Sequence, residues 1–271
     1  MLSIGLFSVA AIACANTLED IKKTKVLKVC IWPDYFGISY RNPRSGTLHG
    51  VDINLSRDLA QELGAKLQYV ETSFANFIAD LEAHKCEIAM MGVGVIPARV
   101  ERVNFSAPYL RSDVFAVTSK ANTTIKTWDD LDRPGRIISV LKGTFMEPLM
   151  KKTLKQATLQ VAERPGERER DVESGRADAF MTDYPYTQRM LANTDWARVI
   201  APSRPLQPTD YAYAIAKGDP AWLARVNQFV AQVKQDGVKY HLGTFVNEYD
   251  AYLAYCDKLE ELTGIKLKRD I

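Results

Sequence analysis

The most informative part of the chain is Glu87-Ile88-Ala89-Met90-Met91-Gly92-Val93-Gly94-Val95-Ile96-Pro97-Ala98-Arg99. Its first part is almost continuously apolar, which is typical of a strand that is buried on both faces of a parallel sheet. One cation, Arg99, follows directly after the run. A guanidinium is planar and grips a carboxylate through two parallel hydrogen bonds. Arg99 is therefore the first candidate ligand-binding residue.

A second apolar run, Ala177-Asp178-Ala179-Phe180-Met181-Thr182-Asp183, ends in an acid. The carboxylate of Asp183 can accept hydrogen bonds from an ammonium group. If Arg99 and Asp183 face each other across a cleft, they would clamp the backbone of a free amino acid. Structural alternatives stay open, namely a surface salt bridge for Arg99 and a helix N-cap for Asp183.

The pattern outward from these runs predicts two α/β units. In the first half, strand and helix patterns alternate, and Asp52 is the expected N-cap of the first long helix. This alternation is the signature of a parallel sheet with right-handed crossovers. The pattern restarts near residue 114 and is followed by a further strand and an amphipathic helix. The expected strands are 25–32, 67–70, 87–95, 114–118, 136–141, 159–162, 178–181 and 211–216, and the main helices are 51–63, 74–81, 146–154, 168–174, 186–192 and 222–235.

Composition restricts the class of protein. The chain has 271 residues, of which 46% are hydrophobic and 25% charged, and a net charge of +2. No block of like charge occurs, so nucleic-acid or membrane-surface binding is not expected. There are only 3 histidines and no CxxC pair, so neither a metal nor another cofactor is predicted.

The N-terminus reads as a secretory signal peptide over residues 1–15. Leu2 to Ala13 is apolar and is followed by an A-x-A pattern that predicts cleavage before Asn16. Lipid attachment at Cys14 and a buried N-terminal helix are the alternatives. An exported protein usually meets an oxidising compartment, and three cysteines remain after cleavage. Cys86 and Cys256 lie near polar residues and are the predicted disulfide, with Cys30 as a packed free thiol.

The residues resemble the polar amino-acid type of periplasmic solute-binding protein, family 3, the extracellular receptor of an ABC importer. The resemblance covers about residues 25–237, and its signatures occur in the family's order. They are Gly50-Val51-Asp52-Ile53-Asn54-Leu55, Phe74 to Leu81, Lys85-Cys86-Glu87-Ile88, Arg99 through Phe105-Ser106-Ala107-Pro108-Tyr109, Gly175-Arg176-Ala177-Asp178-Ala179, and Tyr213-Ala214-Ile215-Ala216-Lys217-Gly218-Asp219.

The resemblance implies a periplasmic-binding-protein-like fold. Two α/β lobes would be joined by two hinge strands, near residues 110–115 and 208–214, around a central ligand cleft. Lobe I would comprise 16–112 and 209–271, and lobe II 113–208. The expected protein is a monomer of the periplasm that delivers an amino acid or another small carboxylate to a membrane permease.

The resemblance also implies the site. Arg99 would hold the ligand carboxylate and Asp183 its ammonium group. Gly92 and Gly94 would offer backbone N–H groups beside Arg99, because the family's hydroxyl side chains are missing there. Gly143 and Thr144 lie in the turn whose backbone N–H groups would meet the same carboxylate, with a helix N-cap as the alternative for Thr144. The expected aromatic walls are Tyr35, Phe74 and Trp32, with core packing as the alternative for each.

Two other functions remain open on the same fold. Some relatives dehydrate prephenate or arogenate, which requires a general acid in the cleft. Glu147 and Glu173 are the available carboxylates of lobe II, but Glu173 has the pattern of an exposed helix residue. The chain is therefore predicted not to be an enzyme of the cyclohexadienyl dehydratase type. The second alternative is a soluble ligand sensor that contacts a membrane receptor.

Overall fold

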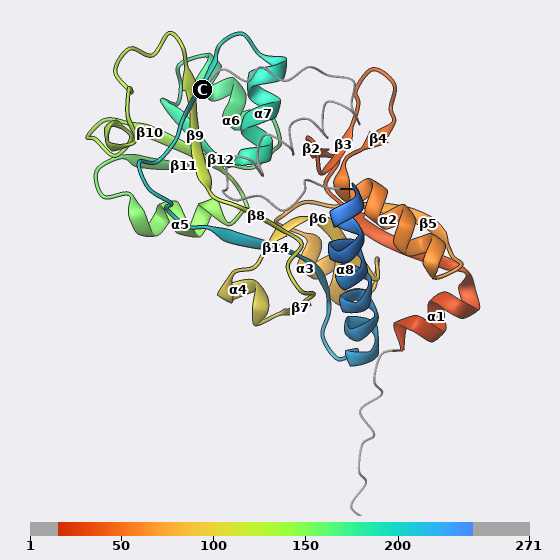
Figure 1. The fold of residues 1–271 in the computed structure, drawn as a ribbon. Coiled ribbons are helices and arrows are strands. Elements are labelled where there is room, and N and C mark those ends of the chain that lie inside the picture. The colour runs from red at the N-terminus through yellow and green to blue at the C-terminus, as the bar shows by residue number, and fades with distance from the viewer. Residues whose placement is uncertain (1–15, 241–271) are drawn as a thin grey trace, which may run out of the picture.

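The computed structural model describes residues 16–240. The predicted signal peptide, with Cys14, and Cys256 lie outside the described residues. Two sheets organise the described chain, and we call the part built on the first sheet lobe I and the part built on the second sheet lobe II (Figure 1).

Lobe I is built on a mixed sheet in the order β5-β1-β6-β14-β7, with β8 paired to β14. The strands β1, β5 and β6 run parallel, whereas β14 is antiparallel to β6 and also pairs with β7 and β8. The apolar stretch that ends before Arg99 is the central strand β6, and all of its residues are buried. The strands are β1 (Val26–Ile31), β5 (Lys66–Glu71), β6 (Ile88–Gly94), β7 (Val103–Phe105), β8 (Leu110–Ser112) and β14 (Thr209–Ala216).

Helices and a small three-stranded sheet complete lobe I (Figure 1). The helices are α1 (Thr17–Thr24), α2 (Val51–Glu62), α3 (Phe77–Glu82), α4 (Pro97–Val100) and α8 (Pro220–Tyr240). The small sheet has the strands β2 (Asp34–Tyr35), β3 (Ser39–Arg41) and β4 (Leu48–His49). The N-cap of α2 is Gly50, so the expectation for Asp52 is wrong. The Asp52 side chain turns into the core, where it accepts hydrogen bonds from Gly92 N at 2.8 Å and Tyr109 Oη at 2.6 Å.

Lobe II is built on the second sheet, in the order β11-β10-β12-β9-β13. Parallel strands β10, β11 and β12 meet antiparallel β9, and Asp183 is the last residue of β12. Its strands are β9 (Val114–Ser119), β10 (Ile137–Leu141), β11 (Thr158–Ala162), β12 (Ala179–Asp183) and β13 (Ala197–Ile200). Its helices are η1 (Trp128–Asp130), α5 (Met146–Thr153), α6 (Glu167–Glu173) and α7 (Tyr184–Asn193).

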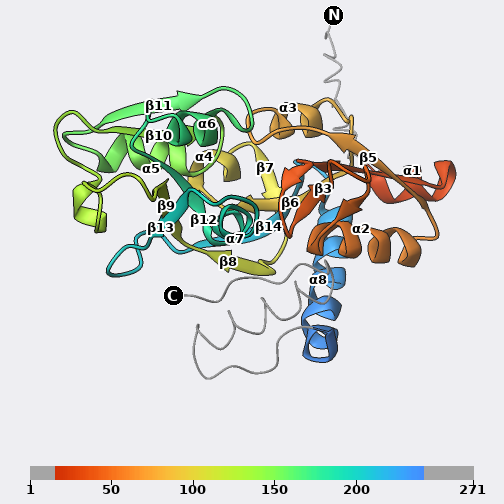
Figure 2. The ribbon, with the colours of Figure 1, turned by 90° about the horizontal axis from the view of Figure 1, so that it is seen from above.

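The chain crosses between the lobes along two paired segments. β8 leads out of lobe I into β9, and β14 returns to lobe I, with Thr209 opposite Ser112 and Tyr211 opposite Leu110. Figure 2 shows both segments between the lobes, seen from above. One cluster of buried apolar side chains includes Trp32 and Tyr35 of lobe I together with Phe145 and Tyr186 of lobe II. The two lobes therefore pack directly against each other.

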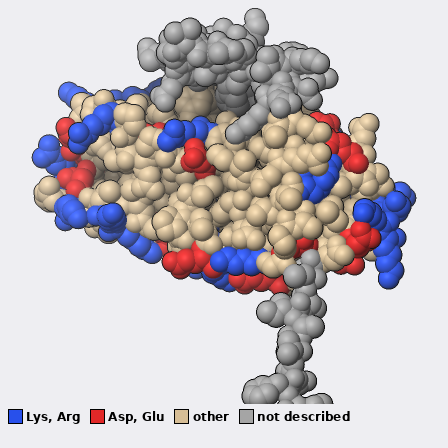
Figure 3. All heavy atoms as spheres, turned by 60° about the horizontal axis from the view of Figure 1, so that its bottom comes forward, with Lys and Arg blue, Asp and Glu red and all other residues tan. Residues whose placement is uncertain are grey.

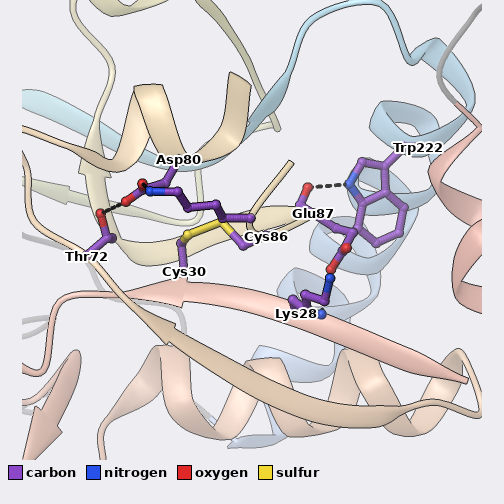
Figure 4. The surroundings of a disulfide bond; sticks show 8 residues. Lys28, Cys30, Thr72, Asp80, Cys86, Glu87 and Trp222 are labelled. Atoms are coloured by element: carbon purple, nitrogen blue, oxygen red, sulfur yellow. Dashed lines mark hydrogen bonds and ion pairs between the residues drawn. A yellow bond between two sulfur atoms is a disulfide. The ribbon is translucent and has the colours of Figure 1, made fainter. Parts of the chain in front are cut away.

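A disulfide joins Cys30 to Cys86, so the predicted pairing of Cys86 with Cys256 and the free thiol at Cys30 are both wrong. Cys30 lies on β1, and Cys86 lies two residues before β6, the parallel neighbour of β1, so the two Cα atoms are 5.6 Å apart. Both side chains are buried in the lobe I core. Figure 4 shows the disulfide beside Glu87, whose carbonyl accepts a 2.9 Å hydrogen bond from Trp222 Nε1.

Candidate functional site

Arg99 lies in the short helix α4, and its side chain points into the interface between the lobes. It is 4% exposed, so it is not a surface residue. Nη1 donates to the Gly94 carbonyl of lobe I at 2.8 Å, and Nη2 donates to the Gly143 carbonyl of lobe II at 2.8 Å. The Phe77 ring centroid lies 5.4 Å from the guanidinium carbon. Arg99 therefore already connects the two lobes.

Arg99 has no anionic partner among the residues that the structure describes. Both of its hydrogen bonds end on neutral carbonyls, and none of the carboxylates whose side chains the structure describes, in residues 16–233, forms an ion pair with it. Burial lowers the pKa of Arg99 to about 10, opposed by the nearby Tyr211 and Tyr35. A buried charge is costly unless it is paired. An anion beside Arg99 would supply the missing partner.

Asp183 occupies the opposite wall of this interface and is 3% exposed. Oδ1 accepts from Tyr186 N at 3.2 Å, which caps α7 as expected for an N-cap acid. Oδ2 accepts from the hydroxyls of Tyr35 and Tyr211, both of which belong to lobe I strands. Burial raises the pKa of Asp183, and the two hydroxyl donors oppose that rise. The acid thus serves as a helix cap and also faces lobe I.

The predicted aromatic residues form one cluster at the same interface. The Trp32 ring centroid lies 5.2 Å from that of Phe74 and 5.6 Å from that of Tyr35. From lobe II, the ring of Tyr186 stacks on Trp32 at 6.3 Å with an interplanar angle of 13°. Trp32 and Tyr35 are buried, so these rings belong to the continuous core as well as to the interface.

The glycines and Thr144 have partners of their own. Gly92 N donates to Asp52, and a side chain at Gly92 would meet the Tyr35 ring. A Cβ at Gly94 would lie 3.1 Å from Phe145 of lobe II, so that ring fills the space where a hydroxyl was expected. The Thr144 hydroxyl donates to Leu141 O at 2.7 Å within its own lobe. Beside Arg99, the aromatic ring of Phe145 therefore lies where a hydroxyl side chain was expected.

Tyr211 and Phe145 were not identified as site residues from the sequence, and the turn at Gly143 and Thr144 was expected to meet the ligand carboxylate rather than Arg99. Tyr211 reaches Asp183 from β14, Gly143 supplies the carbonyl for Arg99, and Phe145 packs on Gly94. Tyr211 had no local signal, because its position depends on the pairing of β14 with β6 across about 120 residues of chain. Phe145 was visible only as a replacement of a threonine in the expected turn.

Other features give no competing site. Within residues 16–240, no cluster of His, Cys, Asp and Glu could hold a metal ion, and no helix is long and apolar enough to cross a membrane. A cavity of about 430 Å³ opens on lobe II beside Trp128, Met150 and Leu206, but it shares no residue with the Arg99–Asp183 interface. Figure 3 shows positive and negative side chains interspersed around the edges of one face, with a largely uncharged middle.

The chain is similar to known proteins along most of its length. The profile of the bacterial extracellular solute-binding proteins, family 3, matches residues 27–243. Cyclohexadienyl dehydratase of Pseudomonas aeruginosa is 29% identical over 86% of this chain and 87% of its own. A probable amino-acid ABC transporter-binding protein of Haemophilus influenzae is 26% identical over 86% and 89%. The crystal structure of an ancestral amino acid-binding protein, described as a precursor of cyclohexadienyl dehydratase, has a TM-score of 0.75 and 33% identity over 91% and 98% of the two chains.

Proposed function

The chain belongs to family 3 of the bacterial extracellular solute-binding proteins, and we propose that it captures an α-amino acid between its lobes for an ABC importer. The observation that carries this proposal is the buried guanidinium of Arg99, which has no carboxylate partner among the side chains described over residues 16–233. A ligand carboxylate there would neutralise the charge and accept from the N–H groups that the two carbonyls leave free.

Asp183 supports the amino-acid class. Its Oδ2 faces the hydroxyls of Tyr35 and Tyr211, where a ligand ammonium group would meet an acid and two hydroxyl oxygens. The ligand side chain would then lie against Trp32 and Phe74, whose rings can cover an aliphatic stem or a cation. A carboxylate ligand without an ammonium group would bind Arg99, and Asp183 would keep only its hydrogen bonds from the two tyrosine hydroxyls.

The cellular setting is part of the same proposal. The first 15 residues would direct export to the periplasm and then be removed. The mature protein would act there as a monomer. Its partner would be the membrane permease of the importer, to which the closed form delivers ligand. The chain would bind and release this ligand without changing it.

A thermal-shift screen tests the proposal. The panel contains the common L-amino acids and, for each ligand that stabilises the protein, the matching amine without a carboxylate and the matching 2-oxo acid without an ammonium group. A ligand at about 100 times its Kd stabilises the folded protein by about 2.7 kcal/mol. We expect the amino acid to shift the melting temperature and the amine to have no effect. A panel in which no α-amino acid stabilises the protein contradicts the proposal.

A second candidate function is dehydration, which the similarity to cyclohexadienyl dehydratase favours. Glu147 accepts from Gly143 N at 2.8 Å and from Lys151 Nζ at 2.6 Å, and Glu173 is exposed. Neither carboxylate is therefore a free, buried general acid. Incubation with prephenate and arogenate, followed by measurement of the aromatic product, separates the two functions. Product formation that depends on the protein would establish the enzyme.

A further inference from the structure

Arg189 of α7 connects the lobes at a place that Arg99 does not touch. Its Nη1 donates to the Asp34 carbonyl at 2.7 Å, and Asp34 lies on β2 of lobe I. The guanidinium carbon also lies 5.4 Å from the ring centroid of Tyr40 on β3. A charged donor on a carbonyl and a cation over an aromatic face are both favourable in a half-buried setting. Arg189 therefore holds lobe II against the small sheet of lobe I.

Lobe II orients Arg189 for this contact. The Tyr186 ring, one helical turn earlier on α7, lies 5.1 Å from the Arg189 guanidinium, and its hydroxyl accepts from Nη1 at 3.2 Å. The guanidinium of Arg168 lies 4.5 Å from the same ring. Arg168 is itself fixed by a 2.8 Å bond to the Met181 carbonyl. Tyr186 contacts both cations and stacks on Trp32, so Arg189 projects from a closely packed surface.

The contact differs from the clamp residues in its partners. Arg99 and Asp183 have the chemistry to grip ligand groups, whereas Arg189 binds a backbone carbonyl and aromatic rings of the protein. Its contribution to closure thus needs no ligand. We propose that Arg189 is a closure latch, a positioning residue that shifts the equilibrium between the open and closed lobes through protein groups alone. The inference rests on the proposed clamp function for its purpose, but its test contains no ligand.

The test measures the distance between the lobes by pulsed electron spin resonance. Nitroxide labels are attached through Ser45→Cys in the β3–β4 turn and Asp195→Cys after α7, both exposed positions on opposite lobes. The exported protein, which begins at Asn16, carries Cys256→Ser, so that labels react only at the two introduced cysteines beside the intact disulfide. The distance distribution without ligand is compared for the parent protein and for Arg189→Ala and Arg189→Lys.

Arg198→Ala is the matched control. Arg198 is also a lobe II arginine that donates to carbonyls, those of Asn122 at 2.8 Å and Ile125 at 2.6 Å, but both acceptors belong to its own lobe. We expect Arg189→Ala to raise the open-to-closed ratio about tenfold or more, the equivalent of losing one hydrogen bond from a charged donor. Arg189→Lys keeps the charge but loses the planar stack, so its open-to-closed ratio should lie between those of the parent and Arg189→Ala. Arg198→Ala should match the parent.

Two results overturn the latch. One is a distribution for folded Arg189→Ala that equals the parent distribution, and the other is an equal opening in Arg198→Ala. Circular dichroism shows whether each variant is folded. If Arg189→Ala does not fold, Arg189→Lys becomes the test, and a distance distribution equal to that of the parent overturns the latch. If Arg189→Ala opens the lobes but no amino acid stabilises the parent protein in the thermal-shift panel, the latch stands and the proposed function is rejected.

Discussion

Gly143→Ala should hold the lobes apart by steric contact alone. A Cβ on Gly143 of lobe II would lie 2.4 Å from Ala75 N and 2.6 Å from the carbonyl carbon of Phe74, both in lobe I. Ordinary van der Waals contact begins near 3.4 Å, which is about 1 Å longer than the 2.4 Å approach of the Cβ to Ala75 N. The lobes must therefore separate there by about 1 Å. The 2.8 Å bond from Arg99 to the Gly143 carbonyl would then exceed hydrogen-bond length.

The expected magnitude follows from that lost bond. A hydrogen bond from a charged donor contributes about 1.5–3 kcal/mol, so ligand affinity should fall roughly 10- to 150-fold. Gly143 also has φ +77°, where alanine costs about 1–2 kcal/mol of stability. Gly175→Ala is the matched control, because Gly175 has φ +75° and no atom within 4 Å of the added Cβ.

Titration calorimetry with the amino acid that gives the largest thermal shift separates these effects. Both variants should lower the melting temperature to a similar extent through backbone strain, and only Gly143→Ala should weaken binding. A Gly143→Ala protein with the parent Kd would show that binding does not require this approach of the two lobes.

Three further predictions concern stability and specificity. Reduction of the Cys30–Cys86 disulfide, which closes a separation of 56 residues, should lower the free energy of unfolding by about 4 kcal/mol in denaturant titrations, and Cys30→Ala/Cys86→Ala should show the same loss without reductant. Burial raises the pKa of Asp52 to about 7, above its ordinary 3.8, so the folded protein binds a proton that the unfolded chain releases. The free energy of unfolding should therefore fall as pH rises from about 4 to about 7, by up to roughly 4 kcal/mol, and a pH series on Asp52→Asn that keeps this slope would reject the assignment. Asp183→Asn should weaken binding of the amino acid but change binding of its 2-oxo analogue much less in parallel titrations, and equal losses would mean that Asp183 does not meet the ammonium group.

Local patterns in the sequence predicted much of the fold. The apolar run before Arg99 became the buried central strand β6, and Asp183 ends β12 and caps α7, because hydrophobic periodicity and capping chemistry act over a few residues. The family resemblance correctly indicated two α/β lobes, which the related solved structure also supports.

The remaining contacts depend on which strands become neighbours. Cys30 and Cys86 pair because β1 lies beside β6, whereas the local polarity around Cys86 had suggested Cys256. Tyr211 reaches Asp183 because β14 returns antiparallel to β6 between the lobes. Asp52 has the residue type of a cap, yet the buried Gly92 N–H and Tyr109 hydroxyl draw its carboxylate into the core. Sheet order and long-range partners of this kind leave no signal in residue spacing.

Calorimetric titration of Arg99→Ala with the amino acid identified in the thermal-shift panel is the strongest test of whether Arg99 holds the ligand carboxylate. Arg99→Ala would leave a buried ligand carboxylate without its charged partner, which costs roughly 2–5 kcal/mol, or about 30- to several-thousand-fold in Kd. Arg99→Lys should also weaken binding, because an ammonium group cannot make the planar two-bond grip. A folded Arg99→Ala protein that binds this amino acid as tightly as the parent would show that Arg99 does not hold the ligand carboxylate.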